Sequence, residues 1–589
     1  MFELETPFSE KLKNQIDITR IPFSTRGSRL TVNQEGHRLT VHQMERFRRV
    51  DIRPINHLQP QPLITNLIFL DKDGNPLNID LETYPHKLEI KTIMGTFGLI
   101  FDTIETILIR LPEGACGVRG NVNIGYGKVD RLGGVFNLHR DERTRFSYST
   151  NRIICFNEVK EIKPGEWQFT LWVAEGEGGG LILNITPRLG LNRYVPDVPN
   201  AFCQAAQSWQ DWISRVPKVD AEYQTKYEYA WWVMNSGLIS TRYFITREAM
   251  TCSKVYSFPI WQWDAYFHAL AYRHIDSKLA QDQLRILLDH QRSNGMLPDA
   301  VHDDGVITQW DTAVDEDLTK PPLLAWVAWK LYEKNQDRGF LNEIYEPIKH
   351  WDEWWFKYND QDGDGLCEVS QLIPSDMDDP VGVGKDTVVI SPDLNTYLYM
   401  QMECLSKIAS ELGEESEATL WQKRANEMLE LMKKQLWDGQ AGLFWAHQQG
   451  RSICVPTPFS LFPLLTGKLE PEISQKLVYH LSDPNGFWTN YPLPTVGLKD
   501  NGQAHPPLWR GPSWVSINYL LMEGLDRSGY PEIADSLCKR TLAVLSENFG
   551  ERGSSDDEKR QLTNAPIYGW TAALFIELAI RASRAKENI

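Results

Sequence analysis

The pattern of apolar and polar positions changes once along this chain. Between about residues 17 and 190, apolar positions mostly alternate with polar ones, as in SRLTVNQ, KLEIKTIMG and WQFTLWVA. A period of two is typical of half-buried β-strands. Turn signals such as Asp73-Gly74 and Pro164-Gly165 separate the runs. This stretch predicts an antiparallel β-sandwich without long helices.

From about residue 220 onward, apolar positions recur at helical spacing. A connecting helix is expected before them, at 200–216. Twelve further helices are expected at 222–238, 263–274, 277–292, 321–335, 338–357, 393–412, 416–436, 458–467, 471–482, 513–526, 531–548 and 568–585. Twelve consecutive helices can pair as six hairpins, which predicts an (α/α)6 toroid. A regular solenoid fits less well, because no repeat of fixed period is detectable.

Tryptophan follows the same division of the chain. Of 21 Trp residues, the first is Trp167 and nineteen follow residue 200. We therefore expect a multidomain protein with a β-sandwich domain at 1–199, a linker helix at 200–218 and an all-α (α/α)6 domain at 219–589. The uneven distribution of Trp indicates that the two larger domains have different tasks.

Composition excludes several classes of partner. Lys and Arg number 61, Asp and Glu number 78, and the resulting net charge of −17 is spread along the chain. Such a field repels phosphate backbones and anionic lipid, so we expect neither nucleic acid nor a membrane as partner. No apolar stretch approaches the roughly 20 residues of a membrane span, and the N-terminus lacks a signal-peptide pattern. The eight Cys are widely spaced, which indicates buried thiols, no metal and a cytoplasmic location.

The helical part offers acids and tryptophans in its loops. Signatures of serine hydrolases, phosphate-binding loops, dinucleotide folds and zinc peptidases are absent from the sequence. Two connections, 293–320 and 358–392, are too long to be simple turns and are rich in Asp, Gly and Pro. Sugars stack on indole rings and their hydroxyls bind carboxylates, and glycoside hydrolysis needs two carboxyl groups across the scissile bond. The loops therefore predict a carbohydrate site.

Five clusters hold these residues. They are W-Q-W-D-A-Y-F-H at 261–268, G-M-L-P-D at 295–299 with Q-W-D at 309–311, S-D-M-D-D-P at 375–380, W-R-G-P-S-W at 509–514, and F-G-E at 549–551 with G-W-T-A-A at 569–573. Each has a plain alternative: an aromatic core capped by Asp264, turn chemistry in a loop, helix packing, or an ordinary exposed Glu551. The carboxylates of the third cluster raise one another's pKa only if they are shielded from water.

One further acidic run, D-Q-D-G-D-G at 360–365, imitates a calcium loop. Its twelfth position is Gln371, where such loops carry Glu. We favour a solvated turn, and calcium binding stays an open alternative.

Taken together and in this order, the clusters resemble the glycoside hydrolases of family 63 and their clan relatives, including trehalase. The likeness is strongest to the bacterial branch of mannosylglycerate and glucosylglycerate hydrolases. The stretch P-F-S-T-R-G-S-R-L at 22–30 resembles the opening of bacterial members, which extends the resemblance into the β domain. The resemblance implies an (α/α)6 catalytic domain and inverting hydrolysis of an α-linked sugar, a reaction that needs no cofactor.

The resemblance also implies roles for individual residues. Asp378 matches the general acid of an S-G-M-D-N-S-P-like motif, and Glu551 matches the general base of an F-x-E-Y motif. We expect the sugar pocket to be lined by Trp263, Asp264, His268, Asp299, Trp310, Asp376, Trp509, Arg510, Trp514 and Trp570.

The chain departs from the family pattern beside both catalytic positions. Asp376 and Asp379 stand where Gly and Asn are usual, and Arg552 replaces the usual aromatic residue after Glu551. The leading hypothesis is an inverting α-glycosidase that acts on a small α-glucoside or α-mannoside, either an oligosaccharide or a glycosylglycerate. The alternatives are a retaining or phosphorolytic relative on the same toroid, and a carbohydrate-binding protein that has lost catalysis.

Overall fold

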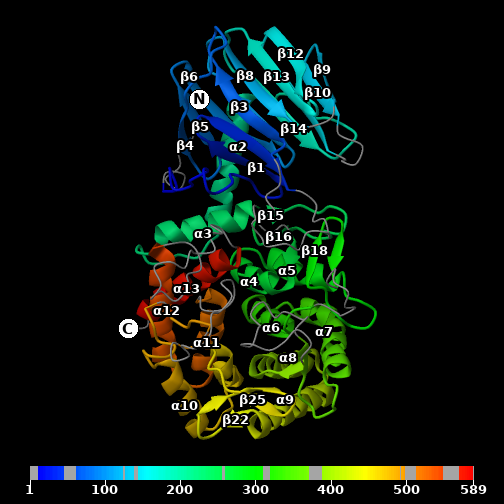
Figure 1. Ribbon diagram of the computed structural model, residues 1–589, viewed down its shortest axis with the longest axis vertical. Coiled ribbons are helices and arrows are strands. Elements are labelled where there is room, and N and C mark those ends of the chain that lie inside the picture. The colour runs from blue at the N-terminus through cyan, green and yellow to red at the C-terminus, as the bar shows by residue number, and fades with distance from the viewer. Residues whose placement is uncertain are drawn as a thin grey trace.

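The computed structural model describes residues 11–44, 62–123, 126–137, 144–254, 259–308, 319–370, 388–490, 492–495, 497, 513–547 and 569–587. Figure 1 shows two stacked parts, strands above and helices below. Between residues 11 and 197, every regular element of the described chain is a strand. The alternating pattern of this stretch predicted that arrangement.

The β region consists of two antiparallel sheets. The first, in spatial order, contains β1 (Leu30–Glu35), β2 (Arg38–Gln43), β3 (Ile64–Leu70), β8 (Cys116–Val122), β13 (Glu166–Val173) and β12 (Ile154–Lys163). The second contains β4 (Asp80–Thr83), β5 (Leu88–Thr92), β6 (Gly95–Thr103), β7 (Thr106–Arg110), β14 (Gly180–Thr186), β11 (Arg145–Thr150), β10 (Gly133–Asn137) and β9 (Tyr126–Asp130).

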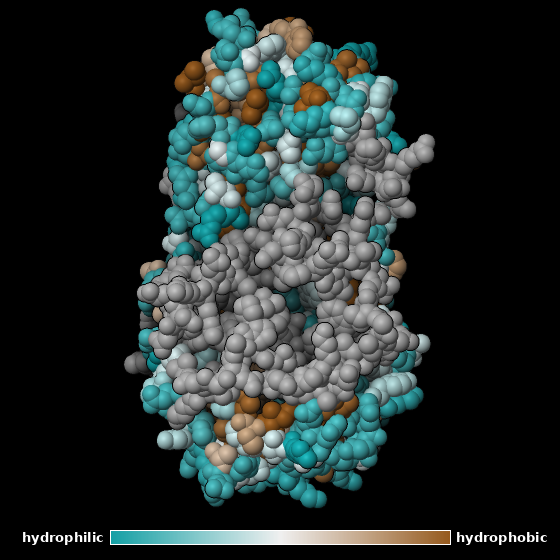
Figure 2. Space-filling view, in the orientation of Figure 1, coloured by the Kyte–Doolittle hydropathy of each residue, from teal (hydrophilic) through white to brown (hydrophobic). Residues whose placement is uncertain are grey.

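Aromatic side chains join the two sheets into a sandwich. The rings of Phe69 in β3 and Phe97 in β6 lie 4.5 Å apart, and Phe169 in β13 stacks on Tyr148 in β11 at 4.6 Å. All four rings are buried. On the face shown in Figure 2, the described surface of this region is mostly hydrophilic, and its hydrophobic side chains are scattered. The apolar residues of the strands thus face the space between the sheets.

Helix α2 (Val198–Ile213) connects the two parts. Its N-cap residue Asp197 accepts a hydrogen bond from the Asn200 amide at 2.9 Å, and this cap starts the helix two residues earlier than expected. Val198 and Phe202 pack on the second sheet. At the other end, the Trp212 indole donates to the carbonyl of Trp231 at 3.2 Å, inside the helical part.

The helical part forms a closed double ring. Its segments are α3 (Gln224–Ser236), α4 (Gln262–Tyr272), α5 (Ser277–Leu288), α6 (Leu324–Asn335), α7 (Arg338–Asn359), α8 (Pro392–Leu412), α9 (Glu415–Gln435), η2 (Pro458–Thr466), α10 (Pro471–Leu481), α11 (Val515–Arg527), α12 (Pro531–Glu547) and α13 (Gly569–Glu587). Among them, α4, α6, α8, η2, α11 and α13 contact one another in this order, and α13 returns to α4. The other six pack outside this inner ring. The architecture is an (α/α)6 toroid, as the helix pattern predicted.

Two local features depart from the expected helices. The segment expected at 458–467 is a 3₁₀ helix, and it contains Pro463, which has no amide hydrogen for an α-helical bond. Short strands also occur between the helices. β17 (Ile260–Trp261) directly precedes α4, and β18 (Ala300–His302) and β19 (Gly305–Ile307) lie in the connection at 293–320; the three form one small sheet. Among the described residues, no helix is both long and apolar enough to span a bilayer.

Candidate active site

Aromatic residues near the starts of several inner helices meet at one end of the ring. Trp263, in the first turn of α4, contacts Tyr397 of α8 with ring centroids 5.9 Å apart. Tyr397 in turn contacts Phe462 of η2 at 5.7 Å. Trp514, the N-cap residue of α11, lies edge to face against Trp570 of α13 at 5.7 Å. This end of the toroid therefore gathers tryptophans from segments that are about 300 residues apart in sequence.

Asp264 lies in the first turn of α4 and is 4% exposed. The N-cap residue of this helix is Trp261, so Asp264 is not the cap that the plain alternative required. A carboxylate in the first turn is stabilised by the positive end of the helix dipole. The Gln262 side chain fixes the start of the helix, since its Oε1 accepts hydrogen bonds from the Lys320 amide at 2.9 Å and the Thr319 hydroxyl at 3.1 Å.

Asp299 lies beside the same helix start. Its carbonyl accepts a hydrogen bond from the Gln262 amide at 2.8 Å, and its own amide donates to the carbonyl of Ile307 at 2.9 Å. The Asp299 carboxylate faces the Lys320 ammonium at 3.4 Å, and both side chains are buried. Lys320 was not among the residues expected from the sequence. The signal available was a single cation just before Pro321, at the end of a long acidic connection.

His268 is one turn further along α4 and is completely buried. Burial lowers its pKa to about 3, so the ring is neutral, and neither ring nitrogen has a hydrogen-bond partner among the described residues. A Cβ placed on Gly569 would lie 2.4 Å from Nε2 of His268. The imidazole thus lies directly against the first residue of α13, whose amide donates to the carbonyl of Cys252 at 2.8 Å.

The structure therefore groups the described members of the expected pocket at one end of the ring. Trp263, Asp264 and His268 come from α4, Asp299 from the edge of β18, and Trp514 and Trp570 from the starts of α11 and α13. The remaining expected residues, Trp310, Asp376, Asp378, Trp509, Arg510 and Glu551, lie outside the described residues.

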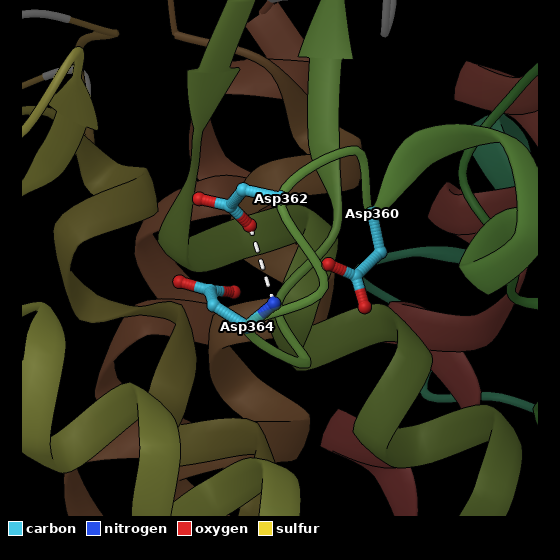
Figure 3. Close-up of side chains that lie close together, drawn as sticks. All are labelled: Asp360, Asp362 and Asp364. Carbon is cyan, nitrogen blue, oxygen red and sulfur yellow. Dashed lines mark hydrogen bonds between the residues drawn. The ribbon is translucent and has the colours of Figure 1, made fainter.

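The acidic run at 360–365 forms a compact turn after α7, shown in Figure 3. Carboxylate oxygens of Asp360, Asp362 and Asp364 lie within 4.8 Å of one another. Each carboxylate accepts a backbone amide of the turn: those of Gly365, Asp364 and Leu366, respectively, at 3.2, 3.2 and 2.8 Å. Burial, aided by the charges of Asp364 and Asp362, raises the pKa of Asp360. The geometry suits a cation, but the turn also accounts for all three carboxylates.

Comparison with known proteins extends these observations. A family model described as the mannosylglycerate hydrolase MGH1-like glycoside hydrolase domain matches residues 256–571. Mannosylglycerate hydrolase of Rubrobacter radiotolerans is 22% identical over 402 residues, which are 54% of this chain and 90% of that protein. The structure of a mannosylglycerate hydrolase of glycoside hydrolase family 63 from Thermus thermophilus, in complex with glucose, is 22% identical over 55% of this chain and 93% of that chain, with a TM-score of 0.46.

A bacterial glucoamylase complexed with acarbose matches 96% of this chain and 94% of its own, at 12% identity and a TM-score of 0.55. This likeness concerns the fold and includes the β region as well as the toroid. The family match covers more than half of the chain and contains the whole cluster at the ring end. The chain belongs to the mannosylglycerate hydrolase MGH1-like glycoside hydrolases, the branch of family 63 that its motifs resemble, and is a glycoside hydrolase.

Proposed function

We propose that this enzyme hydrolyses a small α-glucoside or α-mannoside, with a glycosylglycerate as the first candidate substrate, and that it inverts the anomeric centre. The observation that carries the proposal is the family match over 256–571, which includes the start of every inner helix and the buried residues grouped there. One curated relative that matches over nine-tenths of its length is a mannosylglycerate hydrolase.

In the proposed reaction, Asp378 is the general acid and protonates the glycosidic oxygen as the bond to the anomeric carbon breaks. Glu551 is the general base and takes a proton from the water that attacks the opposite face of that carbon. The two carboxyl groups of an inverting enzyme are expected about 6.5–9.5 Å apart. The reaction needs no cofactor. Trp310, Asp376, Trp509 and Arg510 complete the proposed sugar pocket.

The buried groups of the ring end suit the task of holding a sugar. Indole faces such as those of Trp263, Trp514 and Trp570 match the C–H faces of a pyranose. The carboxylates of Asp264 and Asp299 match its hydroxyls, since carboxylates accept hydrogen bonds. We also propose that residues 219–589 form the catalytic domain, 200–218 the linker and 1–199 a β-sandwich domain, in a cytoplasmic protein.

The test is a panel of small α-glucosides and α-mannosides that includes both glycosylglycerates, read by NMR so that the anomer of the first product is seen. Inversion predicts a β-configured first product. Glu551→Gln should abolish hydrolysis of every substrate, by about 10²–10⁴-fold. Asp378→Asn should act most strongly on substrates with poor leaving groups and spare aryl glycosides. Asp379→Asn, in the same motif, is the matched control.

Other outcomes would replace the proposal by a defined alternative. A first product that retains the α-configuration would indicate a nucleophilic carboxylate, and a requirement for phosphate would indicate phosphorolysis. Binding without turnover across the whole panel would indicate a carbohydrate-binding protein. Near wild-type rates for Asp378→Asn on a glycosylglycerate would show that the acid is Asp376 or Asp379.

A further inference from the structure

One segment of the β region, residues 24–29, is built into the helical part. Gly27 exchanges backbone hydrogen bonds with the strand β15 (Leu238–Ile239) and its neighbour: its amide donates to Leu238 at 2.9 Å, and its carbonyl accepts from Ser240 at 3.0 Å. Gly27 has φ +82°, and a Cβ there would lie 3.0 Å from Ile104. A glycine is therefore favoured at this position, because the left-handed backbone and the Ile104 side chain of the β region both disfavour a Cβ. Backbone hydrogen bonds therefore join the β region directly to the helical part; we call this contact between the two regions the seam.

Arg29 makes a largely buried ion pair between this segment and the helical part. Its Nε and Nη2 donate to the two carboxylate oxygens of Asp303 at 2.9 and 2.7 Å, and Nη2 also donates to the carbonyl of Ser240 at 3.0 Å. The side chains of Arg29 and Asp303 are only 8% and 12% exposed. A bidentate pair of this kind fixes orientation as well as distance. Removal of one partner of a buried pair leaves the other charge poorly compensated.

Asp303 occupies the tip of the hairpin formed by β18 and β19. The register of this hairpin pairs Ala300 with Ile307 and His302 with Gly305, so Asp303 and Asp304 form its turn. The base of the same hairpin is Asp299, four residues before Asp303. On its other side, β18 pairs with β17, where Trp261 lies opposite Ala300 and leads directly into α4. A displacement of the tip is therefore transmitted to Asp299 and to the first turn of α4.

We propose that Arg29 is a positioning residue for catalysis: it holds the β18–β19 hairpin through Asp303, and thereby holds Asp299 and the start of α4 in their working geometry. The inference rests on the proposed function in one respect, since it takes the ring end to be the sugar site. It assigns a task to the β region, which lies before the matched residues 256–571. A displacement of about 1 Å at a catalytic group can cost 10²-fold in rate.

The chain offers a matched control within the same segment. Arg26 donates to the two carboxylate oxygens of Glu248 at 2.8 and 2.7 Å, which is also a bidentate pair across the seam. Glu248 lies outside the hairpin. Arg29→Ala and Arg26→Ala thus each remove one ion pair between the regions. Only the first removes a contact to the hairpin tip, where Arg242 still lies 3.6 Å from the Asp303 carboxylate. Asp303→Asn is a second route to the same release and leaves the β region unchanged.

The first measurement is hydrogen exchange by mass spectrometry on the full-length variants, which needs no substrate. In Arg29→Ala, we expect exchange of peptides within 297–308 and 260–265 to be at least about tenfold faster, with no such change in Arg26→Ala. The second measurement is kinetics on a glycoside that the wild type hydrolyses. There, Arg29→Ala should lower kcat by about 10–100-fold with a change in KM of less than about threefold, and Arg29→Lys should recover part of kcat.

Equal exchange and equal kcat in the Arg29→Ala and Arg26→Ala variants would overturn the inference and reduce Arg29 to a stabilising contact. Should Arg29→Ala fail to fold, Asp303→Asn decides between the same outcomes. The two proposals fail separately. If the wild type hydrolyses nothing on the panel, the proposed function is wrong, while hairpin exchange still shows whether Arg29 holds the hairpin.

Discussion

The two ends of the inner helices differ in how many of their buried charges are paired across helices. Toward their C-terminal ends, charges are matched to one another. Glu577 of α13 is buried and accepts hydrogen bonds from Arg273 at 2.7 Å, His274 at 2.6 Å and the Tyr519 hydroxyl at 3.4 Å. Among the described residues, only Arg273 Nη1 and His274 Nδ1 of this group are buried without a hydrogen-bond partner. At the N-terminal ends, both ring nitrogens of His268 and the indole nitrogen of Trp263 are buried and have no partner in the part of the chain that the structure describes.

Further ion pairs join the C-terminal halves of the inner helices. Arg527 of α11 pairs with Glu403 of α8 and donates to the carbonyl of Thr466 in η2 at 3.3 Å. Lys330 of α6 pairs with Glu523 of α11 at 2.7 Å. Every inner segment thus contributes to this closure. Unsatisfied buried polar groups cost folding free energy, and proteins keep such costs mainly at functional sites. We infer from this difference that the paired charges at the C-terminal ends stabilise the fold, and that the polar groups at the N-terminal ends bind a ligand.

The largest expected effect tests the C-terminal end. Glu577→Gln should leave Arg273 and His274 without their carboxylate and destabilise the fold by about 3–5 kcal/mol, the usual cost of breaking a buried pair. Thermal unfolding should show a Tm lower by several degrees. Because the hydrogen-bond partners of Glu577 are Arg273, His274 and Tyr519, none of them an expected pocket residue, kcat and KM at 25 °C should stay within about twofold. Glu532→Gln, at an exposed position of α12, is the control with no effect.

The pH dependence of the same variant gives an independent check. Burial alone would raise the pKa of Glu577, but the adjacent Arg273 and His274 outweigh it and hold the pKa at about 2. A carboxyl whose pKa is lowered by folding stabilises the protein above its unfolded pKa, and this contribution is lost as pH falls. The Tm of the wild type should therefore fall more steeply than that of Glu577→Gln between pH 5 and pH 3. Parallel curves would contradict the assigned pairing.

The second prediction concerns the N-terminal end. Asp264→Asn keeps the shape of a buried side chain but removes its charge. If the carboxylate binds a sugar hydroxyl, kcat/KM should fall by about 10–150-fold, the equivalent of the 1.5–3 kcal/mol typical of hydrogen bonds to charged groups. Activity should then change far more than Tm. If the variant instead keeps full activity and has a lower Tm, Asp264 stabilises the fold in the same way as the paired charges of the C-terminal ends. The proposed difference between the two ends would then be wrong.

The third prediction tests how closely α13 and α4 are packed. Gly569→Ala places a Cβ 2.4 Å from His268 and 2.9 Å from Met250, so α13 or one of these side chains must shift. Overpacking of this kind costs about 1–3 kcal/mol, and displacement of Trp570 should lower kcat as well. His268→Ala should restore space, and the double variant should recover part of the activity that Gly569→Ala loses. Additive losses in the double variant would show that the two residues do not press on each other.

The sequence predicted the fold through periodicity. Helix α5 has charged residues on one side and Leu279, Leu284 and Leu287 buried on the other, which is a readable pattern. The way in which the inner helices close into a ring was harder to predict from the sequence. An inner helix such as α4 is buried at every position, so its sequence does not show which side faces a neighbour. The expected burial of all thiols was wrong, since Cys155 and Cys454 are exposed. Position along a strand or loop decided their exposure, and composition does not record that.

Residues of the candidate site could be predicted only where a sequence motif contained them. Trp263 and Asp264 were found through W-Q-W-D, and the structure brings them beside Asp299 through the Gln262 amide. Lys320 was missed because its contact with Asp299 joins two segments about twenty residues apart by a pairing that has no spacing rule. The matched charges around Glu577 were missed for the same reason. Contacts between distant helices depend on tertiary packing, and one sequence alone shows no record of them.

The smallest expected effect tests a third place, the turn after α7 in the outer ring. Without a cation, Asp360, Asp362 and Asp364 repel one another, so Asp362→Asn should raise Tm slightly, by up to about 1 °C. Asn can still accept the Asp364 amide through its side-chain carbonyl, so the turn itself should persist. Addition of 1 mM CaCl2 or of EDTA should then leave the Tm of wild type and variant unchanged.

If calcium instead raises the wild-type Tm by several degrees and leaves Asp362→Asn unaffected, the turn is a cation site. Its carboxylates would then be charges kept together for a ligand, as proposed for the N-terminal end of the inner ring, and the contrast between matched and ligand-directed charges would extend beyond that ring.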